Sequence, residues 1–161
     1  MVGCMMRSLS AVGAIAVATL VLTGCGMQVP ADPEGTLERV EGGVLRVGVT
    51  ENAPWVELGP SDEPSGTEPA LITAFAEQHG ATIEWTDGSE AELVDALDRG
   101  ELDLVLGGFL EDTPWVEHAA ATRPYVEDVV GDASEKHVML VHMGENAFLV
   151  ALESFLHEEV G

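Results

Sequence analysis

The spacing of hydrophobic residues predicts four strands. Residues 45–50 and 81–86 alternate between apolar and polar positions and are rich in β-branched side chains, which is typical of strands. Residues 102–106 are almost continuously apolar, as in a central parallel strand, and Gly107-Gly108 is expected to end that strand. Residues 137–143 predict a further strand.

Helical periodicity separates these strands. Residues 69–79 carry an apolar stripe and stop at Gly80. Ser89-Glu90-Ala91-Glu92 matches a capping box, which predicts a helix that ends at Gly100. Residues 145–159 predict the last helix.

Strands that alternate with helices predict an α/β fold, in which a doubly wound, mostly parallel sheet has flanking helices. Ligands of such sheets bind outside the carboxyl ends of the strands. Residues 51–55, 88–90 and 107–113 follow predicted strands, so we expect a site among them.

The first 24 residues indicate an export signal. Arg7 precedes an apolar run over residues 9–22, which is short for a membrane span of about 20 residues. The run ends in Leu22-Thr23-Gly24-Cys25, which resembles the lipobox of bacterial lipoproteins. That resemblance implies cleavage after Gly24 and a lipid anchor on Cys25. An uncleaved N-terminal helix with a buried cysteine is the alternative.

The chain therefore divides into three predicted parts. Residues 1–24 are a lipoprotein signal peptide, and residues 25–43 are a lipid anchor with a flexible acidic tether, rich in proline and glycine. Within the tether, residues 36–40 are expected to form one helical turn. Residues 44–161 form a single domain. We expect the mature protein to be extracytoplasmic, anchored as a lipoprotein to the outer face of the cell membrane.

Composition narrows the class of protein. A formal charge of -23, from 6 Lys+Arg and 29 Asp+Glu, excludes a nucleic-acid partner because no basic face is available. Two cysteines exclude a disulfide scaffold. The acidic residues indicate a solvated surface by default, and they also suit a saline habitat or a cationic ligand.

The order of several short motifs resembles family 3 of the bacterial extracellular solute-binding proteins, the receptors of polar amino-acid ABC importers. The resemblance covers nearly all of residues 45–156 and rests on Pro54-Trp55, Gly66, the LDRGELDLVLG run at 97–107 and Pro124-Tyr125. It implies a lobe of the periplasmic-binding-protein type with a ligand stacked on Trp55.

Two departures from the family pattern matter for function. Only eleven residues separate Tyr125 from His137, where the family carries a whole second lobe. Eleven residues extend at most about 36–40 Å and cannot form a lobe, so we expect one lobe only. Thr113-Pro114-Trp115-Val116 also lacks the arginine that holds the α-carboxylate of the ligand in the family, and Arg123 is the nearest substitute.

The candidate ligand-binding residues are Glu51, Asn52, Trp55, Gly107, Gly108, Phe109 and Thr113. Trp55 either stacks on a solute or covers the rim of the sheet. The glycine pair either lets a ligand approach free backbone N–H groups or forms a tight turn. Glu51, Glu111 and Asp112 either add charge near the site or are solvated loop acids. Trp115 is expected to be a lid over the core.

Other chemistries find less support. His137 and His142, five residues apart on a predicted strand, point to opposite faces, so we expect no metal or cofactor. No Gly-x-Ser-x-Gly elbow is present, and carboxylate pairs are common by chance among 29 acids. We expect a non-enzymatic receptor.

The expected receptor serves ABC-type import of an amino acid or another small polar or cationic solute. Its expected protein partners are an ABC permease, or a second protein or a second copy that supplies the missing wall. The alternative is an adaptor or sensor at the membrane that has lost ligand binding. A small hydrolase or dehydratase on the same fold ranks below both.

Overall fold

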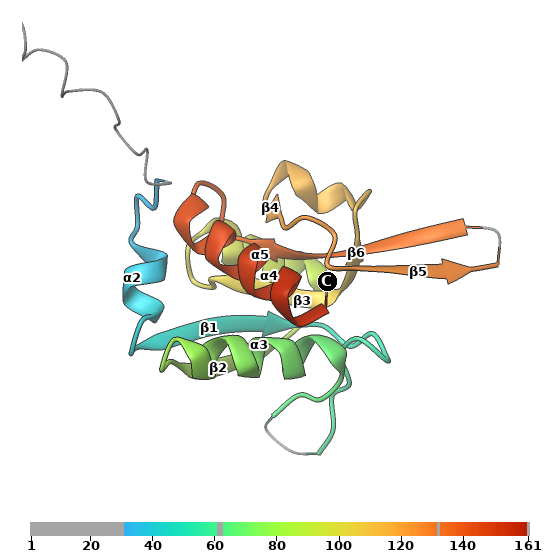
Figure 1. Cartoon of the computed structure of the whole chain (residues 1–161), viewed down its shortest axis with the longest axis horizontal. Helices are drawn as coiled ribbons and strands as arrows, with labels where there is room; N and C mark the ends of the chain where they lie inside the picture. The colour runs from blue at the N-terminus through green and yellow to red at the C-terminus, as the bar shows by residue number, and fades with distance from the viewer. Residues whose placement is uncertain (1–30, 61–62, 132, 161) are drawn as a thin grey trace, which may run out of the picture.

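The computed structural model describes residues 31–60, 63–131 and 133–160. Its centre is a six-stranded sheet in the order β2-β1-β3-β6-β4, with β5 paired to β6 (Figure 1). The strands are β1 (Val44–Val49), β2 (Thr82–Asp87), β3 (Leu104–Leu110), β4 (Ala120–Ala121), β5 (Val126–Val130) and β6 (Ala133–Val141). The helices are α2 (Thr36–Val40), α3 (Thr67–Gln78), α4 (Glu90–Asp98), the 3-10 helix η1 (Pro114–Glu117) and α5 (Asn146–Val160).

The predicted signal peptide and the predicted lipid anchor Cys25 lie outside the described residues. Within the part of the chain that the structure describes, no helix is both long and apolar enough to cross a membrane.

The α/β fold class and the single lobe are confirmed, but the predicted mostly parallel sheet is mixed. Strand β1 runs parallel to β2 and β3, whereas β6 is antiparallel to β3, β4 and β5. Two residues connect β5 to β6, and so short a connection can only join antiparallel strands. The carboxyl ends of β1, β2 and β3, where a site is expected, therefore belong to the parallel half of the sheet. The antiparallel half contains the β5–β6 hairpin.

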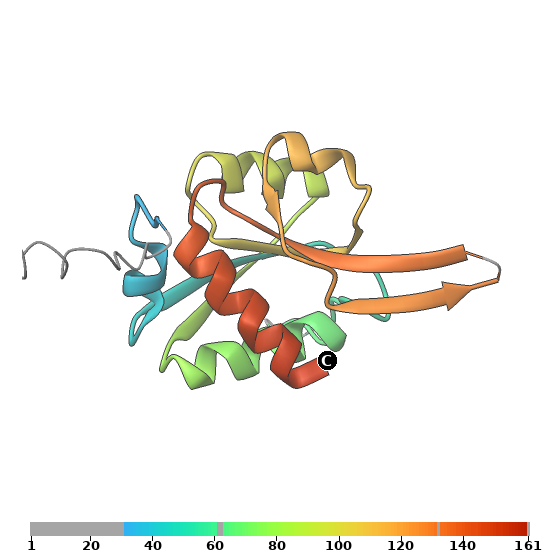
Figure 2. The ribbon, with the colours of Figure 1, turned by 45° about the horizontal axis from the view of Figure 1, so that its top comes forward.

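Helices cover both faces of the sheet. Figure 2 shows α3 and α5 on one face and α4 with η1 on the other. Alternate residues of β3 supply both cores: Leu104 and Leu106 pack with α3 and α5, and Val105 packs with α4. The capping box that was predicted at Ser89 is present and opens α4.

Strand β3 does not end at Gly107-Gly108, so that prediction is wrong. The strand continues to Leu110, and its register with β6 shifts between Val105 and Phe109. Gly108 has φ 62, a left-handed conformation that a glycine adopts without strain. The glycine pair is thus an irregularity inside the strand, of the bulge type that redirects a chain near a functional edge.

The β5–β6 hairpin lies where the sequence left no room for a second lobe. Its register pairs Val126 with His137 and Val130 with Ala133, and the hairpin projects beyond the body of the domain (Figures 1 and 2). Val129 near its end is 76% exposed. Strands β5 and β6 therefore pair directly with each other at the place where the family pattern would insert a second lobe.

The helical turn predicted at residues 36–40 is confirmed as α2, but the flexible tether expected around it is not: residues 31–43 are attached to the domain. Val40 of α2 is fully buried in the core beside α3 and α5. The carboxylate of Glu145 accepts hydrogen bonds from the backbone N–H groups of Glu34 (3.0 Å) and Thr36 (3.1 Å). The prediction failed because these capping contacts come from a residue more than 100 positions away in sequence.

A buried carboxylate lies just before the amino end of the central strand β3. Asp103, 1% exposed, accepts hydrogen bonds from Arg39 (2.7 Å) and Arg46 (2.6 Å). Burial alone would raise the pKa of Asp103, but the hydrogen bonds from the two arginines outweigh it and hold the pKa below its usual value. This cluster links α2 to β1 and to the start of β3.

We expect Asp103→Asn to lower the free energy of unfolding by about 2–3 kcal/mol at pH 7, because two guanidinium groups lose their counter-charge. Because the pKa is lowered, the carboxylate stabilises the fold above its ordinary value of about 3.8 and loses this effect as the pH falls below it. Urea unfolding of both proteins measures the difference. Asp95→Asn, which removes only an exposed pair with Arg99, is the control and should change little.

Candidate functional site

The carboxyl ends of β1 and β3 meet under a short loop. The loop returns on itself through the backbone pairing of Asn52 with Val56. The side-chain amide of Asn52 also donates to the carbonyl of Gly107 (2.7 Å), so the loop is attached to β3. This places the predicted residues Asn52, Trp55, Gly107 and Gly108 together, as the sheet topology requires.

Trp55 is the central side chain of this edge and is half-buried. Its ring stacks on His137 with 3.9 Å between the centroids and meets Tyr125 edge-on at 6.4 Å. A Cβ atom on Gly108 would lie 2.5 Å from Trp55 Cδ1, so only glycine lets the ring approach β3. Trp55 therefore does cover the rim of the sheet, and it keeps part of its surface exposed.

A buried glutamate lies beneath the glycine pair. Glu68, 0% exposed, is the second residue of α3. Its Oε2 accepts the N–H groups of Gly107 (2.8 Å) and Gly108 (3.0 Å), and its Oε1 accepts the Tyr125 hydroxyl (2.6 Å). The free backbone N–H groups that were expected at this pair are therefore occupied by the protein's own carboxylate.

The carbonyls of the pair are engaged as well. Gly107 O accepts from Asn52, and Gly108 O lies 3.3 Å from Nδ1 of His137. All four backbone polar groups of the glycine pair thus have partners inside the chain. A solute at this edge therefore finds no free N–H donor on the glycine pair and must obtain its donors from side chains.

Burial shapes the ionisation of this cluster. Burial raises the pKa of Glu68, against the hydrogen bonds from Tyr125, Gly108 and Gly107 that favour the carboxylate. Burial, followed by the neighbouring Glu68 charge, also raises the pKa of Tyr125, so its hydroxyl remains a donor at physiological pH. Sequence reasoning missed Glu68, because nothing in the sequence distinguishes one buried acid from the other Asp and Glu residues, 29 in all.

The remaining predicted residues are divided between surface and core. Glu51 is exposed, whereas Phe109 and Thr113 are only 5% and 8% exposed and offer little surface to a ligand. Trp115 packs against the α4 core, and its Nε1 donates to Glu90 (2.8 Å), which agrees with the expected lid.

The two histidines have separate surroundings. His137 is buried against Trp55, and His142 follows β6 with a buried Nδ1 that has no hydrogen-bond partner. Among the described residues, no three His, Cys, Asp or Glu side chains are grouped so as to hold a metal ion.

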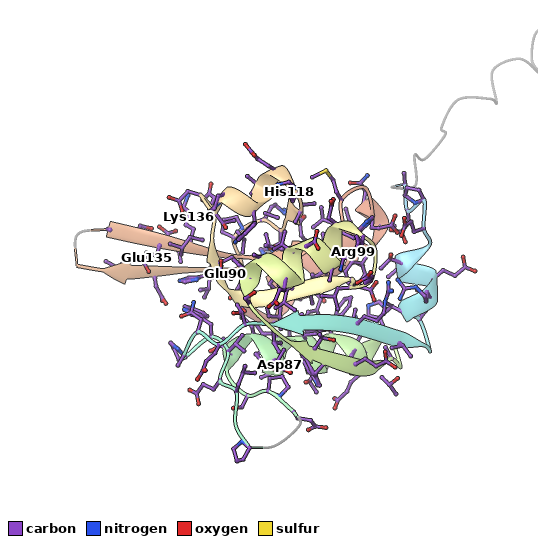
Figure 3. The ribbon with its side chains drawn as sticks, turned by 180° about the vertical axis from the view of Figure 1, so that it is seen from behind. Asp87, Glu90, Arg99, His118, Glu135 and Lys136 are labelled. Atoms are coloured by element: carbon purple, nitrogen blue, oxygen red, sulfur yellow. The ribbon has the colours of Figure 1, made fainter. Side chains whose placement is uncertain are left out.

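An open hollow of about 620 Å³ lies between the end of β3 and the hairpin. Figure 3 shows Glu135 and Lys136 on the hairpin that forms one wall. The lining residues are Leu110, Glu111, Asp112, Glu127, Ser134, Glu135 and Lys136. Trp55 is not among them; it stacks on His137, whose side chain points to the opposite face of β6 from that of Lys136. The exposed acids Glu111 and Asp112 thus line a concave surface that is separate from the aromatic side chains around Trp55.

Comparison with known proteins identifies relatives of the sequence. A family model described as bacterial extracellular solute-binding proteins, family 3, matches residues 45–159. Membrane-bound lytic murein transglycosylase F of Aliivibrio fischeri is 34% identical over 93 residues, which is 56% of this chain and 19% of that protein. Membrane-bound lytic murein transglycosylase F 2 of Alkalilimnicola ehrlichii is 35% identical over 104 residues, 64% of this chain and 23% of that protein. The match spans about a fifth of these relatives.

Solved structures share the fold. The arginine-bound form of domain 1 from TmArgBP superposes with a TM-score of 0.66 at 20% identity, over 75% of this chain and 97% of that chain. The L-cystine solute receptor of Neisseria gonorrhoeae, in the unliganded open conformation, gives 0.64 at 11% identity, over 76% and 89%.

The raised pKa of Glu68 predicts a pH dependence of stability. The folded protein retains this proton at pH values where the unfolded chain has released it. The free energy of unfolding therefore falls as the pH rises from the ordinary value of 4.5 through the raised pKa, by at most about 1.4 kcal/mol per pH unit. Glu68→Gln should have a flatter profile in urea unfolding between pH 4 and 8. Glu77→Gln, an exposed acid on the same helix, should keep the wild-type slope; equal slopes in all three proteins would contradict the assignment.

Proposed function

The chain belongs to the bacterial extracellular solute-binding proteins of family 3, and on that basis we propose that it is a non-catalytic receptor for a small polar solute outside the cytoplasmic membrane. The proposed binding edge is the one formed by Glu51, Asn52 and Trp55, together with the neighbouring hollow at the hairpin.

The observation that carries this proposal is the match to a single domain. The TmArgBP domain is described as arginine-bound, and this chain covers 97% of it. A lobe of this architecture can therefore hold an amino acid without its second half. Partial exposure of Trp55 at the strand ends supports the same conclusion, because an aromatic face there can contact a solute.

Transport and anchoring extend the proposal. The family resemblance supports delivery of the solute to an ABC permease, and the Leu22-Thr23-Gly24-Cys25 run supports a lipid anchor on Cys25. The transglycosylase names belong to proteins that the match covers only to 19–23%, and we propose no enzymatic activity for this chain.

One observation favours a second candidate, an adaptor or sensor without a ligand. All four backbone polar groups of the glycine pair contact the side chains of Glu68, Asn52 and His137. One face of the Trp55 ring stacks on His137. A surface satisfied in this way suits contact with another protein as well as contact with a solute.

A thermal-shift screen of the full-length chain against amino acids, polyamines and compatible solutes separates the two candidates. A solute at 100 times its Kd should stabilise the fold by about 2.7 kcal/mol. For a domain of this size the midpoint then rises roughly 2–4 °C per kcal/mol. Trp55→Ala should abolish the shift, and Trp115→Ala, a half-buried tryptophan over α4, should retain it. A flat screen on folded protein would favour the adaptor.

The anchor is tested in cells. Cys25→Ser should release the protein from the membrane fraction and abolish labelling with radioactive palmitate, because serine cannot receive a thioether-linked lipid. Cys4→Ser, within the predicted signal, should leave both unchanged. Membrane retention of the Cys25→Ser protein would contradict the lipoprotein assignment.

A further inference from the structure

Strand β2 forms an edge of the sheet, and among the described strands only β1 pairs with it (Figure 3). The N–H groups of Thr82 and Gly88 donate toward β1, to the carbonyls of Gly43 (2.9 Å) and Val49 (3.2 Å). Residues of a parallel strand direct their backbone groups alternately to the two sides. The N–H and C=O groups of residues 83, 85 and 87 therefore point away from β1, where another extended chain can pair with them.

Two hollows lie along this edge, on the face of the sheet that α3 covers. The first, of about 210 Å³, is lined by Ile83, Trp85 and residues of α3. The second, of about 390 Å³, is lined by Trp85, Val49 and Leu58. Trp85 and Pro64 line both hollows and so separate them. Side chains on one face of a strand repeat every two residues, about 6.6 Å, so an added strand can place residues i and i+2 in the two hollows.

The charge beside these hollows is negative. Glu77 of α3 lines the first hollow and Asp87 lines the second, and both side chains are exposed. Among the described residues, no Lys or Arg lines either hollow. A second copy of the chain would bring a strand that carries the same acids, Glu84 and Asp87, and like charges destabilise a strand pair. Charge complementarity therefore favours a basic partner over a second copy.

We propose that the free edge of β2 binds an extended, basic segment of another protein as an added strand. Backbone hydrogen bonds to residues 83, 85 and 87 hold the segment. Two apolar side chains at positions i and i+2 enter the hollows on either side of Trp85, and flanking Lys or Arg side chains pair with Glu77 and Asp87. Trp55 lines neither hollow, so this surface is separate from the proposed solute edge and goes beyond the proposed function.

Synthetic hexapeptides test the proposal by titration calorimetry on the full-length chain. Each carries Lys at both ends, Thr at the second and fourth positions, and Val, Leu, Ile, Met or Phe at the third and fifth. We expect at least one peptide to bind with a stoichiometry near one, and its form with Glu in place of Lys to bind at least about 10-fold more weakly. No binding by any peptide, or equal binding of the Lys and Glu forms, would overturn the proposal.

N-methylation of the bound peptide tests for an added strand. Only every second N–H group of such a strand faces β2. Methylation of one alternate set should therefore weaken binding at least about fivefold, whereas methylation of the other set should preserve it. Equal loss with both sets, or equal retention, would show that the peptide does not pair as a strand and would overturn the proposal.

Amide hydrogen exchange, followed by NMR, locates the bound peptide on the chain. Binding should slow the exchange of the N–H groups of Ile83, Trp85 and Asp87 at least about 10-fold, because they gain acceptors. Thr82 and Gly88, which already donate to β1, should change less. Unchanged exchange at all three outward groups would overturn the proposal. Slower exchange at the same groups in concentrated protein without peptide would assign the edge to a second copy and would overturn it too.

Tryptophan variants separate this surface from the solute edge. Trp85→Ala should abolish peptide binding, because it removes the side chain that both hollows share. Trp55→Ala should leave peptide binding unchanged, although it is expected to abolish the response to a solute. Loss of peptide binding in Trp55→Ala, with Trp85→Ala folded and unaffected, would place the peptide at the other edge and overturn the proposal. A flat solute screen with retained peptide binding would overturn only the receptor function.

Discussion

The buried carboxylate of Glu68 is the constraint on which the functional edge depends. One side chain receives donors from β3 and from the segment before β5, while it is held at the start of α3. Glu68 therefore brings together two parts of the chain that are 39 to 57 residues away from it in sequence. Trp55 rests on the surface that this arrangement creates, because Gly108 has no Cβ atom, which would otherwise lie 2.5 Å from the ring. A carboxylate buried without those donors would be strongly unfavourable, so the cluster forms as a unit.

Positive and negative side chains have different places in this domain. Described cations serve the architecture: Arg39 and Arg46 join α2, β1 and β3 through Asp103, and Arg123 attaches the chain before β5 to α5. The acids, with a formal excess that gives -23 overall, remain mainly at the surface. The same arrangement that stabilises the sheet thus leaves the excess of negative charge on the surface.

Most of the fold could be predicted from local patterns. Periodicity located β1, β2, α3, α4 and α5 to within a few residues, and the length of the segment after Tyr125 predicted one lobe. Local patterns failed where distant residues decide the outcome. Strand β3 continues through Gly107-Gly108 because Glu68 and Asn52 satisfy its backbone there, and α2 packs because Glu145 caps it. The site was predicted at the correct edge, but the partners of its glycine pair could not be read from sequence spacing.

The β5–β6 connection also affects how this protein can fold. In a two-lobed relative, the return strand of the first lobe emerges only after the second lobe has been synthesised, and the first lobe is completed by a long-range closure. Here two residues separate β5 from β6, and all six strands lie within residues 44–141. The entropy of closing the sheet at that point is that of a short loop. The sheet of this lobe is therefore completed by a contact between neighbouring segments, which makes it less dependent on the order in which distant parts of a chain fold.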